Sequence, residues 1–446
     1  MGRTIRAYGP PPPPRKQAGA LRELLKSRDV YDLDRDTTRR PFDFEKVRVV
    51  RDGVNPIPLE SVCGPHALPT VLNPYAHILK SDAEIAELRP EDHVEPYTDP
   101  ALQRPGELRR LVDKLHETRF LTFRRVCRSK VGIFTVAKKD GLLRLIFDCR
   151  PANVLHREPP RSELSAANAY TNIDWSDDTL QSTPDRPAQL FFFSALDLTD
   201  AFYQHGWERM SSWFCIDLRV RAHEFDVTEV LNELTGEMEP VGPMDWVWPA
   251  LAVLPMGWAW SLWFVHHALC DAMVTAEMKR GGVPRAEVEP RLLRDRRQCP
   301  VLRAGAPTLA PYVDNAILHC WDEQDGRESF AALKAELDSR GFVTRDEVIA
   351  SRTIDAVGLY LDGKKKVIYN KSARVWRLYY AGHQLVRQGH CTGEVMRVIA
   401  GHFLHAFQLR RCAMSSLGEI FAFIEKFLTL DTPLPPRVLG ALQGPR

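Results

Sequence analysis

Two acidic motifs, each beside a strand-like apolar run, constrain the fold of this chain most strongly. The first is Leu196-Asp197-Leu198-Thr199-Asp200-Ala201-Phe202-Tyr203, and the second is Tyr312-Val313-Asp314-Asn315. Each motif places a carboxylate at or near the end of a predicted strand. Two such carboxylates that converge in space make a Mg²⁺ site, and a pair of divalent cations is how enzymes handle nucleoside triphosphates. We therefore expect Asp197 and Asp314 to meet.

Composition allows a nucleic-acid partner without requiring one. The 446 residues are enough for two or three domains or for one large multi-lobed domain, and a content of 44% hydrophobic and 26% charged residues is ordinary for a folded protein. The net charge is only +2, but positions 104–150 hold thirteen Lys and Arg against five Asp and Glu. This basic stretch suits a phosphate backbone, and a solvated basic surface explains it equally well.

Cysteine usage favours a reducing compartment. The nine cysteines form no Cys-x-x-Cys pair, and their odd number argues against a complete disulfide framework. His266, His267 and Cys270 lie close together on a predicted helix without a recognised zinc-ligand spacing, so buried Cys and helix-face His are the preferred interpretation.

The N-terminus lacks an apolar signal segment. We expect an intracellular protein, with nucleus and cytoplasm both open.

One long apolar stretch imitates a membrane span. Residues 246–265 contain no charged residue and are long enough to cross a bilayer. Pro249, Pro255 and Gly257 interrupt the stretch, and its tryptophans are spread along it instead of gathering at its ends. The pattern therefore predicts a buried strand, a turn and a buried helix, with no membrane partner.

Periodicity and turn residues predict the other elements. The predicted helices are 108–120, 260–278, 329–340, 394–407 and 417–428. The predicted strands are 131–136, 142–147, 190–196, 251–254, 356–361 and 366–369, with a hairpin at 311–320. Residues 1–45 contain a polyproline run and predict an extended, unpacked tail. Residues 46–100 predict an irregular leader, and residues 281–307 an irregular, Arg-rich insert.

Four further motifs accompany the two acidic ones. They are Lys138-Lys139-Asp140-Gly141-Leu142-Leu143-Arg144-Leu145-Ile146-Phe147-Asp148-Cys149-Arg150-Pro151-Ala152-Asn153, Leu254-Pro255-Met256-Gly257-Trp258-Ala259-Trp260-Ser261, residues 333–342, and Val357-Gly358-Leu359-Tyr360-Leu361-Asp362-Gly363. In order and spacing, the six motifs resemble the reverse transcriptases of retroviruses and LTR-type retrotransposons. The resemblance covers residues 131–363, about half of the chain.

The resemblance implies an α+β, right-hand polymerase fold. In that fold, residues 101–190 form the fingers and residues 191–365 the palm, with the insert at 281–307. The palm consists of an antiparallel sheet packed on helices. Residues 366–446 form a helical region like a thumb or connection domain.

The resemblance also implies how a nucleotide binds. Lys138 and Arg144 grip the triphosphate, Lys as a mobile point charge and Arg as a bidentate fork. The backbone amides around Asp200 and Ala201 face the same phosphates. Phe202 stands at the sugar-gate position and excludes a 2′-hydroxyl, which implies a dNTP. Met256 and Gly257, in the motif that begins at Leu254, support the new base pair.

The predicted metal ligands are Asp197, Asp314 and the Leu198 carbonyl. They bind two Mg²⁺ ions, for which Mn²⁺ can substitute, about 3.5–4 Å apart. Asn315 completes the catalytic set but replaces the second Asp of the family's Tyr-x-Asp-Asp motif. It removes one negative charge, so weaker metal binding is expected.

The resemblance implies an RNA-directed DNA polymerase of retroelement origin, which extends a primer on an RNA or DNA template. An alternative is a reverse-transcriptase fold that no longer polymerises and binds nucleic acid as a scaffold. Asn315, Met256 in place of Gln, and the bulky Trp260 favour this alternative. An adaptor that acts through the Pro-rich tail is a third, weaker possibility. The oligomeric state is open.

Overall fold

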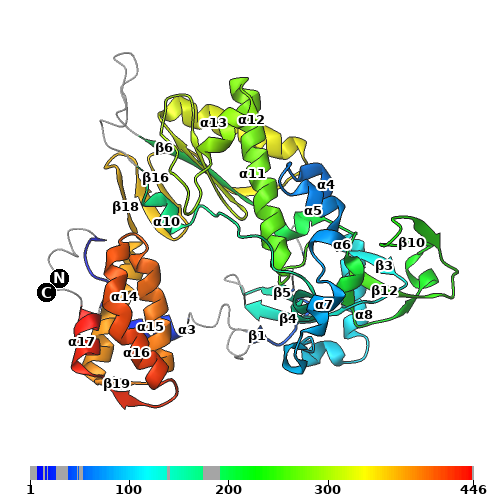
Figure 1. The fold of residues 1–446 in the computed structure, drawn as a ribbon, viewed down its shortest axis with the longest axis horizontal. Coiled ribbons are helices and arrows are strands. Elements are labelled where there is room, and N and C mark those ends of the chain that lie inside the picture. The colour runs from blue at the N-terminus through cyan, green and yellow to red at the C-terminus, as the bar shows by residue number, and fades with distance from the viewer. Residues whose placement is uncertain are drawn as a thin grey trace.

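The structure is a computed structural model that describes residues 8–13, 16–17, 19–26, 39–47, 49, 54–137, 141–173 and 191–443. Lys138, a predicted triphosphate contact, lies outside the described residues. The described chain is mixed α/β. Sheets and long helices make up the larger part, and a group of C-terminal helices lies to one side (Figure 1).

Both acidic motifs belong to one antiparallel sheet. Its strands lie in the order β13 (Thr308–Tyr312), β14 (Asn315–Cys320), β6 (Phe192–Leu198) and β15 (Thr344–Ser351). Helices α11 (Ala259–Gly281) and α13 (Glu323–Ser339) cover one face. Because side chains alternate along a strand, Leu196 and Leu198 pack in the core with these helices, whereas Asp197 lines a cavity on the other face. The predicted strand at 190–196, hairpin at 311–320 and helix at 260–278 are confirmed; the helix predicted at 329–340 begins earlier, at Glu323, and β15 was not predicted.

A smaller sheet lies beside that other face. It consists of β16 (Thr353–Ala356), β17 (Leu359–Asp362) and β18 (Val367–Asn370). The hairpin turn after Asp362 is confirmed, but the continuous strand predicted over 356–361 is wrong. Val357 and Gly358 have φ of 49° and 78°, so the chain turns there and residues 353–356 pair with 359–362. A left-handed backbone interrupts an extended strand.

The basic region folds into a second sheet. Its strands are β1 (Arg39–Arg40), β3 (Leu121–Arg124), β4 (Lys130–Ala137), β5 (Leu143–Asp148), β8 (Cys215–Ile216), β9 (Val220–Arg221) and β12 (Trp246–Leu251). The predicted β4–β5 hairpin is confirmed. Helix α8 (Glu107–Glu117) matches the periodicity over 108–120.

The uncharged stretch 246–265 forms strand β12, a turn and the start of α11, as predicted. The strand lies at 246–251 and not at 251–254, because Pro249 does not end it. Ala250, the next residue, pairs with both β3 and β8. None of the described helices is long and apolar enough to cross a membrane.

Short elements connect the sheets. The leader contains β2 (Ile57–Pro58), α4 (Leu59–Val62), α5 (Leu68–Leu72), α6 (Pro74–His77), α7 (Asp82–Ala86), η2 (Pro90–Asp92) and η3 (Pro100–Gln103). Between the main strands lie α9 (Arg150–Leu155), α10 (Ala167–Tyr170), η4 (Ala201–Gln204), β7 (His205–Gly206), η5 (Ser211–Trp213), η6 (Ala222–Phe225), β10 (Glu229–Leu231) and β11 (Met238–Pro240). The insert contains α12 (Arg285–Val288) and η7 (Glu289–Arg291) between irregular segments.

The C-terminal helices have a core of their own. They are α14 (Ser372–Gln388), α15 (Gly393–Phe407), η8 (Arg411–Leu417), α16 (Gly418–Lys426) and α17 (Pro436–Gln443), with a short β19 (His390–Cys391) paired to β20 (Thr432–Pro433). The prediction of an unpacked tail over 1–45 is wrong for α3 (Ala20–Lys26). Ala20, Leu21 and Leu24 form an apolar stripe at helical spacing that is buried in this core. Strand β1 also pairs with β4.

Leu24→Ala is expected to lower the free energy of unfolding of the C-terminal core by about 2–4 kcal/mol, because it leaves a cavity where a Leu is 2% exposed. Denaturant unfolding followed by circular dichroism measures the change. Arg22→Ala, at an exposed position of the same helix, is the matched control. Equal midpoints for the two variants would show that α3 does not contribute to this core.

Candidate active site

Strand pairing brings the two acidic motifs together. Asn315 on β14 is the register partner of Asp197 on β6. Asp314 lies in the tight turn between β13 and β14, and its carbonyl oxygen accepts a hydrogen bond from the Leu198 N–H at 2.9 Å. The two carboxylate residues are therefore neighbours, as predicted, although they are far apart in sequence.

The two carboxylates share a partly desolvated environment. Burial, and then the charge of Asp314, raises the pKa of Asp197 to about 6, whereas Arg345 lowers it. Burial also raises the pKa of Asp314, against a hydrogen bond from the Asn315 amide at 2.9 Å and the charges of Arg345 and Arg144. Carboxylates perturbed by burial and by neighbouring charges are typical of functional sites.

No sequence pattern identified Arg345 as part of this site. Arg345 lies on β15 and is the register partner of Asp197 on the other side of β6. Its Nε and Nη2 atoms lie 2.7 Å and 2.5 Å from Asp197 Oδ2. Asp197 Oδ1 is buried and has no hydrogen-bond partner among the described residues. An arginine in a predicted strand gives no sign of its pairing register, so only the folded sheet reveals this contact.

The donor atoms fit one divalent cation. Hard cations take oxygen ligands, and the orphaned Asp197 Oδ1 and the Asp314 carboxylate supply them. In the described part of the chain, no group of three or more His, Cys, Asp or Glu side chains is placed to hold a metal ion. Asn315 stands where a third carboxylate would complete such a group. The predicted pair of Mg²⁺ ions stays a prediction.

An acidic cavity of about 530 Å³ adjoins Asp197. It lies between β6, β14, β15 and the β16–β18 sheet, and Asn315, Asp346, Asp355 and Tyr360 are among its lining residues. Because the cavity carries several carboxylates, its charge suits a cation better than a phosphate.

The predicted nucleotide-binding residues lie on separate elements around the carboxylates. Asp200 has a φ of 47° and precedes η4, which contains the buried Ala201 and the half-buried Phe202. Arg144 is exposed on β5, and its charge opposes the rise that burial causes in the pKa of Asp314 and of Tyr203. Arg144 therefore acts on the site through its charge, although it lies in the other sheet.

The turn with Met256 and Gly257 docks against β5. Gly257 has a φ of 126°, and a Cβ there would lie 2.2 Å from the Phe147 carbonyl oxygen, so a larger residue does not fit. Asn153 joins the two motifs. Its Nδ2 donates to the Gly257 carbonyl at 2.9 Å, and its Oδ1 accepts from the Ala259 N–H at 3.0 Å. The last residue of the Lys138 motif thus holds this turn in place.

Trp260, whose bulk favoured a non-catalytic interpretation, is accommodated in the core. It is buried beside Trp263 and Phe264, and its Nε1 donates to the Arg157 carbonyl at 2.7 Å. Its size is therefore absorbed by packing and by a satisfied hydrogen bond. The effect of Trp260 on catalysis stays a prediction.

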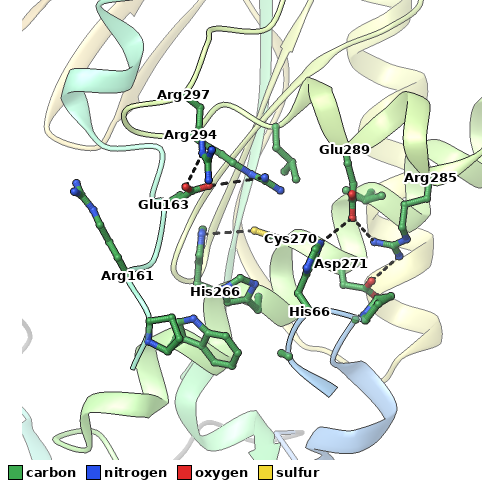
Figure 2. Close-up of a pocket in the computed structure, with 18 residues that line it drawn as sticks. His66, Arg161, Glu163, His266, Cys270, Asp271, Arg285, Glu289, Arg294 and Arg297 are labelled. Carbon is green, nitrogen blue, oxygen red and sulfur yellow. Dashed lines mark hydrogen bonds and ion pairs between the residues drawn. The ribbon is translucent and has the colours of Figure 1, made fainter. Parts of the chain in front are cut away.

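A second pocket, of about 350 Å³, contains the residues for which zinc was considered (Figure 2). His266 Nε2 lies 3.6 Å from Cys270 Sγ, and burial lowers the pKa of His266 to about 3. Arg294 and Arg297 of the insert both pair with Glu163, at 3.8 Å and 2.7 Å. These ion pairs tie the insert to the segment around Glu163, whose single negative charge the two arginines share. The nine cysteines, all within the described residues, are free thiols.

No protein-family model matches the chain, and no curated protein sequence does. The chain is similar to the solved foamy viral protease-reverse transcriptase dRH in complex with double-stranded DNA, at 13% identity and a TM-score of 0.49, over 98% of this chain and 62% of that one. It is also similar to a Prototype Foamy Virus protease-reverse transcriptase CSH mutant, at 15% identity and a TM-score of 0.35, over 80% of this chain and 35% of that one. This chain spans less than two thirds of the length of either protein. Likenesses this remote carry no functional argument.

Proposed function

We propose that the chain is a template-directed nucleotidyltransferase of the reverse-transcriptase type, which adds dNTPs to a primer 3′-hydroxyl on an RNA template. The placement of Asp197 beside Asp314 in one sheet supports this proposal most directly. Arg144 on β5 acts on Asp314 through its charge, and η4, with Phe202, follows Asp197 closely in the chain. Acidic ligands, a phosphate-binding guanidinium and an aromatic ring are what this chemistry needs.

Each residue has a distinct role in the proposed reaction. Asp197 and Asp314 would hold Mg²⁺, with the Leu198 carbonyl as a further ligand. When bound, this ion would supply positive charge against the triphosphate and make the primer hydroxyl more acidic. Arg144 binds the triphosphate, and Lys138 is proposed to join it. Asp200 and Ala201 present backbone amides, and Phe202 excludes a 2′-hydroxyl.

The proposal assigns the sheets to parts of a right-hand polymerase. The sheet with β6 is the palm, the strands β3, β4 and β5 within residues 101–190 belong to the fingers, and the C-terminal helices are the thumb. A template-primer duplex then lies against the palm between the other two parts. Basic residues of the fingers contact its phosphates, so binding is expected to weaken with salt.

Asn315→Asp is expected to raise the rate of dNTP incorporation by about tenfold, because it adds a carboxylate directly opposite Asp197 and strengthens divalent-cation binding. Primer extension on an RNA template with Mg²⁺ or Mn²⁺ measures the rate. Asn315→Ala, which removes the amide without adding charge, should not raise the rate of dNTP incorporation. An unchanged rate in Asn315→Asp would contradict the role given to the missing charge.

A second candidate is a nucleic-acid-binding scaffold with a reverse-transcriptase fold and no polymerase activity. The Arg345–Asp197 ion pair and the amide of Asn315 beside Asp314 favour it, because both reduce the charge available to a cation. Template-primer binding that is equal with and without Mg²⁺, together with no extension by wild type or Asn315→Asp, would establish the scaffold. Deletion of residues 1–17, which precede helix α3, tests the adaptor, which would lose its partner while nucleic-acid binding survived.

A further inference from the structure

Arg345 covers one half of the Asp197 carboxylate and leaves the other half open. Both guanidinium contacts, at 2.7 Å and 2.5 Å, go to Oδ2. Oδ1 is buried and unpaired among the described residues. The Asp197 side chain is 13% exposed and that of Arg345 is 31% exposed, so solvent screens this pair only in part. A cation that approaches Asp197 therefore meets the positive charge of Arg345.

The site carries few charges, so the charge of Arg345 has a large effect on cation binding. Asp197 and Asp314 carry two negative charges, Asn315 carries none, and Arg345 cancels one of the two. A divalent cation at this point binds carboxylate oxygens and is repelled by a guanidinium a few ångströms away. Arg345 and the cation therefore compete for the same carboxylate.

Arg345 has a second carboxylate within reach. Asp346 Oδ2 lies 3.7 Å from Arg345 Nε, and its side chain is 79% exposed. Asp346 has a φ of 52°, and the pairing of β15 with β6 shifts register between Arg345 and Val348. Such bulges redirect side chains at functional edges of sheets. The guanidinium thus has two acidic partners that line the same cavity, the largely buried Asp197 and the exposed Asp346.

We propose that Arg345 is the built-in counter-ion of Asp197, that it occupies this carboxylate in the cation-free protein, and that it passes to Asp346 when a divalent cation binds. The proposal rests on the proposed function only in assigning a cation to Asp197. It makes Arg345 a positioning residue that sets the cation concentration at which the site fills. At low concentrations the ion pair keeps the site closed.

Manganese binding measures this competition without any nucleotide or primer. Free Mn²⁺ is followed by electron paramagnetic resonance during titration of the full chain. Arg345→Ala is expected to bind Mn²⁺ roughly tenfold more tightly than wild type, the equivalent of one partly buried ion pair. Arg352→Ala is the matched control. Arg352 is exposed near the same sheet, lies over the Phe192 ring at 5.6 Å, and forms no ion pair with a described residue. The Mn²⁺ affinity of the Arg352→Ala variant should equal that of wild type.

A double-mutant cycle tests the transfer to Asp346. Asp346→Asn should weaken Mn²⁺ binding in wild type, because Arg345 then has no second partner. In the Arg345→Ala background the same change should have an effect of less than about twofold. Equal weakening in both backgrounds would overturn the transfer, since Asp346 would then act as a simple nearby charge.

Other outcomes separate this inference from the proposed function. Equal Mn²⁺ affinity in wild type and Arg345→Ala, or no binding by either, overturns the inference even if primers are extended. Tighter binding by Arg345→Ala without any extension supports the inference and contradicts the polymerase. If Arg345→Ala does not fold, Arg345→Met keeps the length of the side chain without its charge and is subject to the same expectation.

Discussion

Asp197→Ala is expected to lower template-directed dNTP incorporation by about 10³-fold, the scale of losing a central electrostatic contact in an active site. Asp197 provides a cation ligand, and neighbouring residues do not replace it. Its register partner Asn315 is uncharged, and Arg345 would be left facing Asp314 across an empty position. Single-nucleotide primer extension measures the loss. In the Asn315→Asp background the starting rate is expected to be higher, so the loss of rate can be measured over the widest range.

Asp355→Ala is the matched control for this loss. Asp355 lines the same cavity but pairs with Lys371 at 3.0 Å, and its side chain is 58% exposed. It should retain the rate of the parent protein. Template-primer affinity, measured by fluorescence anisotropy, should be unchanged in both variants. Extension that survives Asp197→Ala would exclude this carboxylate from the chemistry and would contradict the proposed function.

Acidification from pH 7.5 to 5.5 is expected to lower the free energy of unfolding by about 5 kcal/mol. Burial lowers the pKa of four histidines that are at most 3% exposed, to about 3 for His156, His266 and His319 and to about 4 for His205. Unfolded, each titrates near 6.5, so below that pH the unfolded chain binds more protons and stability falls. At pH 5.5 each of these histidines therefore lowers the free energy of unfolding by about 1.4 kcal/mol. The raised pKa of Asp197 opposes this loss by about 1 kcal/mol.

His319→Phe tests this account at one position. The His319 ring lies 5.4 Å from Tyr170 and 5.3 Å from Phe193, and neither ring nitrogen has a partner among the described residues. A phenyl ring fits the same aromatic surroundings without an unsatisfied polar group. The free energy of unfolding of the variant should be about 1–2 kcal/mol higher than that of wild type at pH 7.5. At acidic pH the variant should take up about one proton fewer on unfolding than wild type does.

Denaturant unfolding at several pH values measures both effects. His77→Phe, at an exposed position, is the matched control and should change neither stability nor its pH dependence. A wild-type protein whose stability is unchanged between pH 7.5 and 5.5 would show that these histidines are not buried in the neutral form. A destabilised His319→Phe variant would instead show that His319 has a polar partner.

Many of the main elements could be predicted because their signals are local. The Asp-Gly turns located the hairpins after Ala137 and Asp362, and helical periodicity located α8, α11 and α13. The strand-end positions of Asp197 and Asp314 predicted their convergence, because a carboxylate at the end of one strand meets its counterpart when the strands pair. These signals depend on the few residues that surround each element.

The errors arose where distant parts of the chain decide the local structure. Helix α3 was hidden by the proline-rich residues before it, because its apolar stripe is stabilised only by the C-terminal core. Strand β12 continues through Pro249 because β3 and β8 pair with it on both sides. The strand expected over 356–361 is broken by two left-handed residues, which the apolar pattern did not indicate.

By itself, the sequence determined the elements and the motifs, since turn chemistry, periodicity and strand-end carboxylates act over short distances. Only the tertiary structure decided what stands next to Asp197. The pairing of β15 with β6 places Arg345 on its carboxylate, and the pairing of β14 places the uncharged Asn315 on its other side. A one-residue shift in either register would turn these side chains to the opposite face of the sheet. That register is set by long-range packing of the whole sheet, which no local pattern records.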